Sequence, residues 1–184
     1  FEVEYCEMTN NKAIAFDHTV RKLPHMHENI TFVKEGIAAA PFKKLNTYKS
    51  HKKQFGGKKI FLKMDVEGWE FPVFENLIKE DVEDIVGIVI EVHNLDKKIN
   101  NLFEILESVL SDFVIYHIHP NNFGKTFNID GCEFPAVIEL SLVNKKYCDK
   151  VERISPTYPM ELDVKNSKRK KDIPISFLYE ETVK

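Results

Sequence analysis

The feature that most constrains the fold of this chain is residues 60–77, IFLKMDVEGWEFPVFENL, where an apolar run stops at acidic residues. The run Ile60–Met64 is too short for a helix and is typical of a buried parallel strand. Asp65 then lies at the carboxyl end of that strand, where open α/β sheets bind their ligands. Glu67 and Glu70 follow at the opening of a helix. The same pattern is consistent with an N-cap and first-turn charges that only stabilise this helix.

Further apolar runs predict the other strands of an α/β sheet. They are residues 13–16, 30–33, 85–92 and 113–118, and a partner strand over 133–143 follows a loop that contains the turn dipeptide Asp130-Gly131. Apolar residues at helical spacing predict a helix over 97–110, and a lysine-rich element over 43–55 ends at Gly56-Gly57. We therefore expect one α/β domain over residues 1–150. Residues 151–184 are expected to form an extended arm that docks through apolar residues, among them Phe177 and Leu178; a disordered tail is the alternative.

The motif region resembles a known family. LKMDVEGWEFPVFENL is similar to the LK(I/M)D(V/I)EGAE motif of FkbM-type methyltransferases, which move a methyl group from S-adenosylmethionine to an oxygen, often on a sugar. Residues 62–69 fit the pattern except at Trp69, where small residues are usual. The resemblance implies a Rossmann-like class I methyltransferase sheet, mostly parallel and closed by a C-terminal antiparallel hairpin. Because no GxGxG precedes Asp17, we expect the first strand and its glycine-rich loop to lie upstream of Phe1.

The cofactor-binding residues are expected at the ends of the early strands. Asp17 ends the strand over 13–16, and a carboxylate there can accept hydrogen bonds from both ribose hydroxyls. An aspartate that caps the following turn explains it equally well. In the resemblance, AFDHTV matches the acidic end of that strand, which favours ribose. The other candidates are His18, Gly36 and Ile37 at the end of the third strand, where Gly36 could let the backbone approach a flat adenine ring, and Asp65. Gly36 is also consistent with a turn glycine.

The catalytic candidates are Asp65, Glu67 and His93. Methyl transfer to a hydroxyl needs a positioned acceptor and a group that takes its proton. Imidazole titrates near neutral pH, and the strand that carries His93 is expected beside the central strand, so His93 is the predicted base. Asp65 and Glu67 would orient the acceptor. Glu91 lies two residues before His93 on the same strand face and would orient it or bind substrate. A structural histidine at a strand end is the alternative.

The remaining substrate-binding candidates lie in the stretch HIHPNN, at His117, His119 and Asn122. Their donors and acceptors suit a sugar, and loops of this kind set specificity, although a buried turn network would use them equally well. By family analogy, the acceptor is a hydroxyl of a surface polysaccharide or a glycosylated metabolite.

Two other functions remain open. Asp65, Glu67, Glu91 and His93 are compatible with Mg²⁺ or Mn²⁺, although their spacing assigns none of them as a metal ligand. A metal-dependent sugar-processing hydrolase could use the same groups. A methyltransferase-like domain without catalysis, kept as an interaction module, is the other reading.

Composition limits the partners of this chain. A net charge of −3 over 184 residues argues against a broad basic surface for nucleic acid, although the tail carries a basic run at Lys168–Lys171. No apolar stretch is long enough to cross a bilayer and no signal peptide is visible, which favours a cytoplasmic protein. Cys6, Cys132 and Cys148 are scattered and predicted to be reduced thiols. The oligomeric state cannot be read from the sequence.

Overall fold

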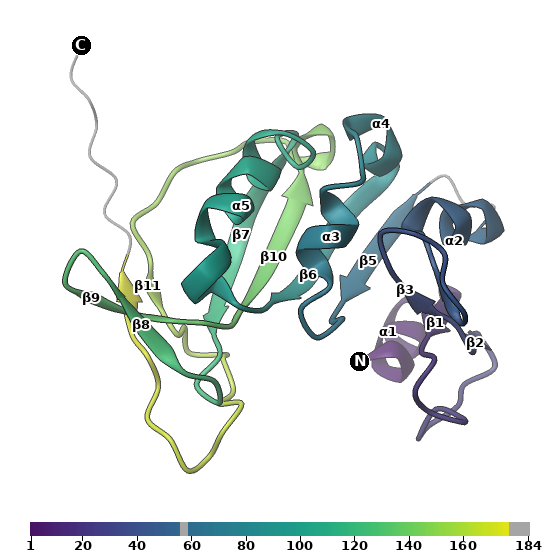
Figure 1. Ribbon diagram of the computed structural model, residues 1–184, viewed down its shortest axis with the longest axis horizontal. Coiled ribbons are helices and arrows are strands. Elements are labelled where there is room, and N and C mark those ends of the chain that lie inside the picture. The colour runs from purple at the N-terminus through teal and green to yellow at the C-terminus, as the bar shows by residue number, and fades with distance from the viewer. Residues whose placement is uncertain (56–58, 177–184) are drawn as a thin grey trace. The chain divides into compact units, whose positions relative to one another are not determined.

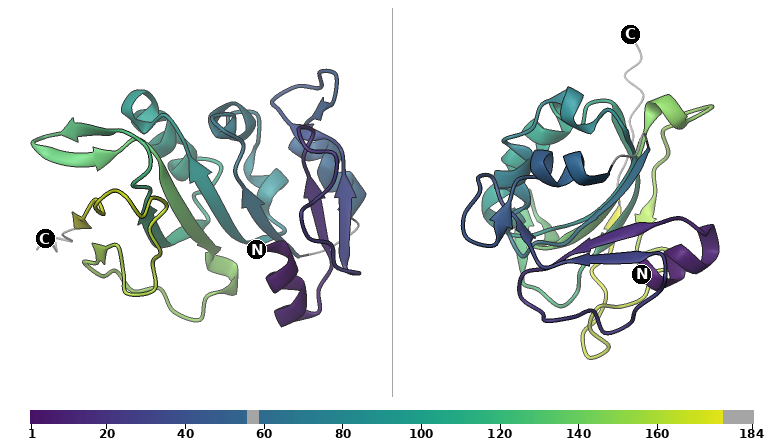
Figure 2. Two further views of the ribbon diagram at one scale, coloured as in Figure 1. Left: turned by 90° about the horizontal axis from the view of Figure 1, so that it is seen from below. Right: turned by 90° about the vertical axis from the view of Figure 1, so that its right-hand side faces the viewer.

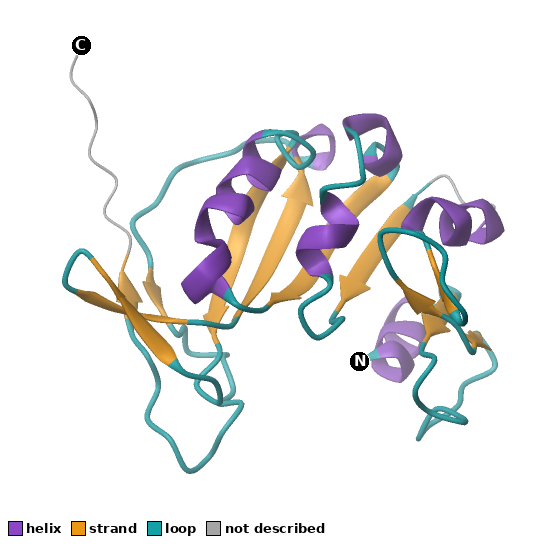
Figure 3. Ribbon diagram, in the orientation of Figure 1, coloured by secondary structure: helices purple, strands orange, loops and turns teal. Residues whose placement is uncertain are grey.

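The computed structural model describes residues 1–55 and 59–176. It contains two compact units, Phe1–Gly57 and Lys58–Lys184, each of which combines helices and strands (Figures 1 and 3). The predicted mixed α/β class is confirmed. The predicted helix end at Gly56-Gly57 and the apolar Phe177 and Leu178 lie outside the described residues.

The first unit holds two small parallel sheets. Its elements are α1 (Glu2–Thr9), β1 (Ala13–Phe16), β2 (Ile30–Val33), β3 (Gly36–Ile37), β4 (Leu45–Asn46) and α2 (Tyr48–Phe55). Strands β1 and β2 pair in parallel, as do β3 and β4. Asp17 directly follows β1, so the predicted strand with an acid at its carboxyl end is present.

The second unit is built on a four-stranded sheet with the order β5-β6-β10-β7. Its first elements are β5 (Ile60–Met64), α3 (Glu70–Phe74), α4 (Lys79–Val82), β6 (Ile85–Val92), α5 (Leu95–Glu107) and β7 (Phe113–Pro120). They are followed by β8 (Thr126–Ile129), β9 (Cys132–Pro135), β10 (Ile138–Asn144), η1 (Lys145–Tyr147), β11 (Thr157–Tyr158) and β12 (Ile175–Ser176). β5 and β6 are parallel, and β10 is antiparallel to both of its neighbours.

The register of this sheet separates an apolar face from a polar one. Met64, Ile90, Leu140 and Ile118 are aligned across the four strands, and all are buried. Helices α3 and α5 lie over this face (Figures 1 and 2), where Phe71, Phe74, Leu102 and Ile105 complete the interior. The adjacent row, Lys63, Val89, Ser141 and His117, points to the other face because strand side chains alternate. Polar residues at the strand ends are therefore not needed for the core.

Two details of the sheet differ from the prediction. The described residues form separate small sheets, so no single Rossmann-like sheet is evident among them. The strand expected over 133–143 is split between β9 and β10, because Asp130-Gly131 closes a local β8–β9 hairpin, with φ of 49° and 88° at the turn. The antiparallel pairing of β7 with β10 is present as expected.

The three cysteines are not joined in disulfides; Cys6 is buried, Cys132 exposed and Cys148 half-buried. Within residues 1–55 and 59–176, no helix has the length and apolar character that a bilayer span requires.

Candidate functional site

A tight turn carries the chain from the end of β5 into α3. Glu67 and Gly68 both adopt left-handed conformations, with φ of 54° and 98°. A Cβ atom on Gly68 would also lie 3.0 Å from Asn94 Nδ2, so glycine is required here for both its backbone angle and its size. The backbone N–H groups of Val66 and Gly68 point inwards and donate to Glu70 Oε1 at 3.4 and 3.1 Å. The turn at Glu67 and Gly68 therefore positions two backbone N–H groups that bind the Glu70 carboxylate.

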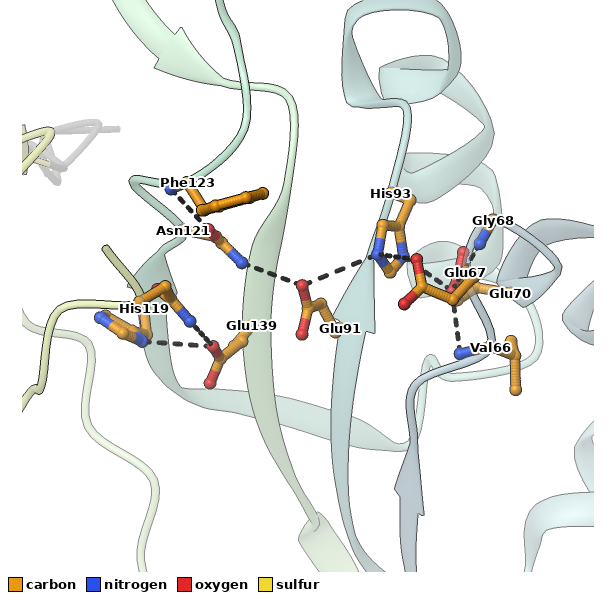
Figure 4. Close-up of polar contacts among 11 residues, drawn as sticks. Val66, Glu67, Gly68, Glu70, Glu91, His93, His119, Asn121, Phe123 and Glu139 are labelled. Atoms are coloured by element: carbon orange, nitrogen blue, oxygen red, sulfur yellow. Dashed lines mark hydrogen bonds and ion pairs between the residues drawn. The ribbon is translucent and has the colours of Figure 1, made fainter. Parts of the chain in front are cut away.

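Glu70 is a buried carboxylate that holds His93. Its side chain is 2% exposed, and Oε1 lies 2.9 Å from His93 Nδ1 (Figure 4). Because an ionised carboxylate can only accept, the proton of this hydrogen bond belongs to Nδ1. Burial raises the pKa of Glu70, but the hydrogen bonds from His93 and Gly68 outweigh it and leave the pKa below its usual value. Glu70 is thus an anion that fixes the orientation and tautomer of the imidazole.

The other nitrogen of His93 faces two further acids. His93 Nε2 lies 3.6 Å from Glu67 Oε2 and 3.7 Å from Glu91 Oε1, and the imidazole is 15% exposed. The hydrogen bond to Glu70 raises the pKa of His93; burial opposes this, and the charges of Glu70, Glu91 and Glu67 reinforce it. With its Nδ1 proton held by Glu70, His93 can take up or release a proton at Nε2.

Glu91 connects this histidine to the end of β7. Its Oε1 accepts a 2.9 Å hydrogen bond from Asn121 Nδ2, and Asn121 Oδ1 accepts one from the Phe123 N–H at 2.8 Å (Figure 4). Burial, followed by the charge of Asp65, raises the pKa of Glu91. A continuous polar chain therefore crosses the strand ends from Glu70 through His93 and Glu91 to Asn121.

A second polar pair lies beside this chain on the same face of the sheet. Glu139 of β10 is the cross-strand partner of both Glu91 and His119. His119 Nδ1 lies 3.5 Å from Glu139 Oε1, which also accepts a 2.8 Å hydrogen bond from Asn166. This pairing raises the pKa of His119 and lowers that of Glu139, against the opposing effect of burial on each.

The other two predicted substrate-binding residues contact the tail of the chain. His117 Nε2 lies 2.8 Å from Asp163 Oδ1, and the ring of Tyr158 meets the His117 ring edge to face. Asn122 is buried and bonds the backbone near Ser167. The contacts of His117 and Asn122 are those of an internal network, which is the alternative that the sequence left open. A role of these two residues in substrate binding stays a prediction.

The predicted cofactor residues of the first unit lie close together around β1 and β3. Asp17 Oδ1 accepts hydrogen bonds from the N–H and hydroxyl of Thr19, each 2.6 Å, and from the Val20 N–H at 3.3 Å. The Thr19 hydroxyl is the main cause of the lowered pKa of Asp17. A Cβ atom on Gly36 would come within 2.4 Å of His18 Nδ1, so packing against His18 explains this glycine. Ile37 is half-buried in β3. Cofactor binding by these residues stays a prediction.

The structure brings together most of the acids that the motif region predicts, together with His93. Asp65 is exposed at the end of β5, and single ligand atoms of Asp65, Glu70 and His93 lie within 4.8 Å of one another, which is close enough to hold a divalent cation. Sequence reasoning treats Glu70 as a helix-start charge, although its place as the final acid of the KxDxEGxE pattern is an available signal. Asn121 is recognised only as one of the polar residues of the HIHPNN stretch that suit a sugar, and no local pattern indicates its bond to Glu91.

Fold and site together define an α/β domain with an acid–histidine site at the carboxyl ends of two parallel strands, an arrangement suited to proton transfer. Comparison with known families agrees with this class. Residues 42–116 match the family model of the methyltransferase FkbM domain. This segment contains the whole β5–α3 motif and His93, so the predicted resemblance is confirmed and the match indicates a methyltransferase. No curated protein and no solved structure matches the chain.

Proposed function

We propose that this chain is an S-adenosylmethionine-dependent O-methyltransferase, in which His93 takes the proton from an acceptor hydroxyl on a sugar. The observation that carries the proposal is the hydrogen bond between His93 Nδ1 and the buried Glu70, which leaves Nε2 directed at the strand ends. The family match supports methyl transfer. The parallel β5–β6 pair followed by the antiparallel β10 and β7 supports a class I methyltransferase sheet.

The chain offers residues that fit the cofactor chemically. The Asp17 carboxylate is half-buried at the carboxyl end of a parallel strand and immobilised through one oxygen, which suits it to vicinal ribose hydroxyls. His18, Gly36 and Ile37 would contact the adenosine part, and Asp65 the amino group of the methionine part. When bound, S-adenosylmethionine supplies the methyl group as an electrophile and leaves as S-adenosylhomocysteine.

The protein's own contribution is to position the acceptor and move its proton. The acceptor O–H donates to His93 Nε2, and that proton moves to the nitrogen as the oxygen becomes nucleophilic. Glu70 stabilises the imidazolium that forms, since its carboxylate is already paired with Nδ1. Glu91, held by Asn121, and Glu67 accept hydrogen bonds from neighbouring hydroxyls of the acceptor.

Calorimetric titration of the full-length protein with S-adenosylhomocysteine tests the cofactor assignment. Asp17→Ala and Asp65→Ala should each weaken binding by about tenfold, the cost of losing one charged hydrogen-bond partner. Asp130→Ala, which changes an acid at the tip of the β8–β9 hairpin, should bind normally. A folded protein that shows no binding at all would exclude the proposed function.

A second candidate function, metal-assisted processing of a sugar, is favoured by the cluster of Asp65, Glu70 and His93. Under this reading, the three side chains hold a divalent cation and the sugar is hydrolysed. Titration with MnCl₂ separates the two candidates. Tight Mn²⁺ binding that Asp65→Ala abolishes, in a protein indifferent to S-adenosylhomocysteine, would favour the hydrolase.

A further inference from the structure

The buried Asn122 side chain fastens the basic part of the tail to the sheet. Its Oδ1 accepts the Ser167 N–H at 2.7 Å, and its Nδ2 donates to the Ser167 carbonyl at 3.1 Å. The carbonyls of Lys170 and Lys171 lie at 3.4 Å from the same nitrogen. One amide therefore satisfies several backbone groups of a segment that has no regular secondary structure. This is a stabilised attachment, since a buried amide costs free energy unless it is hydrogen-bonded.

Other contacts hold the same segment on either side of this amide. Asp163 bonds His117, and Asn166 bonds Glu139 at 2.8 Å. Lys170 Nζ donates to the carbonyls of Phe123 and Gly124. We call residues 163–171 the strap. Its backbone lies along the polar face and the end of β7, and its course is set by contacts to the sheet and to the loop after β7.

The strap presents exposed cations. Lys168, Arg169 and Lys171 are all exposed. Among the residues that the structure describes, none of these three side chains forms a hydrogen bond or ion pair, whereas Lys165 is paired with Asp172 at 3.2 Å. Fixed backbone with unpaired cations is an arrangement suited to an anion from outside the chain.

The position of the strap connects this charge to the candidate site. Asn122 is the neighbour of Asn121, which bonds Glu91, and Glu91 faces His93 (Figure 4). Acids and the histidine thus gather at the ends of β5 and β6, while unpaired cations gather beyond the end of β7. A ligand that fits both regions carries hydroxyls at one end and negative charge at the other.

We propose that the strap binds the phosphate group of a phosphorylated sugar, whose hydroxyl is presented to His93. The inference rests on the proposed methyl transfer to a sugar and adds the chemical class of the acceptor. Arg169 can pair with two phosphate oxygens at once, and Lys168 and Lys171 add charge without fixed geometry. The acids around His93 repel the phosphate from the reaction centre. The acceptor therefore binds with its phosphate at the strap and a hydroxyl at His93.

The test is a titration of the ¹⁵N-labelled full-length protein with glucose 6-phosphate, followed by two-dimensional NMR, with glucose and inorganic phosphate as comparison ligands. The strap variant is Lys168→Ser with Arg169→Ser. Its control is Lys146→Ser with Lys150→Ser, which removes the same charge beyond the opposite end of β10. We expect glucose 6-phosphate to shift the amide signals of the strap and the 121–124 loop. The strap variant should bind it roughly tenfold more weakly, and the control should not change.

Two results would overturn the inference. One is the absence of shifts in the strap with either phosphate ligand, and the other is an equal loss of affinity in the two double variants. Binding to vesicles that contain phosphatidylserine, without binding of glucose 6-phosphate, would assign the strap to lipid headgroups and also overturn it. Titration of the same samples with S-adenosylhomocysteine separates these outcomes from a failure of the proposed function, because the strap variant retains all of the predicted cofactor residues.

Discussion

At the scale of single residues, the candidate site depends on one buried carboxylate. Glu70 occupies a position where a helix-start charge would normally be exposed, yet it is 2% exposed and bonds His93. Sequence alone could identify the acids of the motif, because an acid after a buried strand is a local pattern. It could not show which of them is buried, since that depends on α3 packing against β6 and on the turn at Gly68, which are contacts between separate segments.

Glu70→Gln should lower kcat by at least about tenfold and leave KM and the affinity for S-adenosylhomocysteine unchanged. The glutamine has the same shape, but its NH₂ group can donate to His93 Nδ1, which moves the imidazole proton to Nε2. ¹⁵N chemical shifts of His93 at one pH should report this change of tautomer. Glu75→Gln, an exposed position at the end of α3, is the control. An unchanged tautomer together with normal kcat would show that Glu70 has only a structural role.

The His119–Glu139 pair makes stability depend on pH. The folded-state pKa of His119 is raised, so its contribution is complete below its unfolded value of about 6.5 and is lost as the pH rises through the folded pKa. The pKa of Glu139 is lowered, so its contribution is present above its unfolded value and is lost in more acidic solution. Stability from this pair is therefore greatest between about pH 4.5 and 6.5.

Urea unfolding of the wild type and His119→Gln between pH 5 and 9 checks this dependence. The difference in unfolding free energy should reach up to about 1 kcal/mol near pH 6 and shrink at alkaline pH. His25→Gln, which changes an exposed histidine of the first unit, should show no such trend. A difference that grows towards pH 9 would have the wrong sign for a raised pKa.

At the scale of elements, the turn between β5 and α3 decides whether the site forms. Gly68→Ala should destabilise the protein by about 1–2 kcal/mol, because alanine is strained at this positive φ and its Cβ would crowd Asn94. Gly131→Ala shares the positive φ but meets nothing within 4 Å, so it measures the backbone cost alone. Gly124→Ala, with ordinary contact to Val137 at 3.4 Å, has neither cost. Thermal unfolding should show the largest loss of stability for Gly68→Ala, a smaller loss for Gly131→Ala and the smallest for Gly124→Ala. Equal losses in the three variants would contradict this account of the turn.

The individual strands could be predicted, but their arrangement could not. β1, β2, β5 and β6 were expected at their observed bounds, because apolar runs with acids or turn residues at their ends are local signals. The position of β10 between β6 and β7 depends on pairing between segments far apart in the chain, which no local pattern encodes. The β8–β9 hairpin differs from the prediction although its signal is local. The dipeptide Asp130-Gly131 predicts a turn, but a turn dipeptide does not show whether it joins two short strands or lies in the longer connection between β7 and β10.

At the scale of the whole molecule, the sheet and the tail contribute different residues to the candidate site and its surroundings. The sheet supplies acids and a histidine at its strand ends, and the tail returns to the polar face, where Asn166 bonds Glu139. The predicted domain over 1–150 and arm over 151–184 stay a prediction, but the contacts of Asp163 and Asn166 show that the described part of the arm is held by side chains of β7 and β10. The tail also contributes buried apolar side chains, Tyr158, Ile173 and Ile175, so its polar contacts add to an apolar attachment.

Asn122→Ala tests whether one side chain keeps the strap in place. The variant loses every hydrogen bond from this amide and leaves the Ser167 N–H without its partner, so the strap should separate from the sheet more often. Trypsin, which cleaves after lysine and arginine, should cut residues 168–171 about tenfold faster, as followed by mass spectrometry. Asn128→Ala removes an exposed turn contact to Gly131 and should leave this rate unchanged. Equal cleavage rates in the wild type and Asn122→Ala would contradict this role of Asn122. The position of the strap, and of its cations, would then depend on the bonds of Asp163 to His117 and of Asn166 to Glu139.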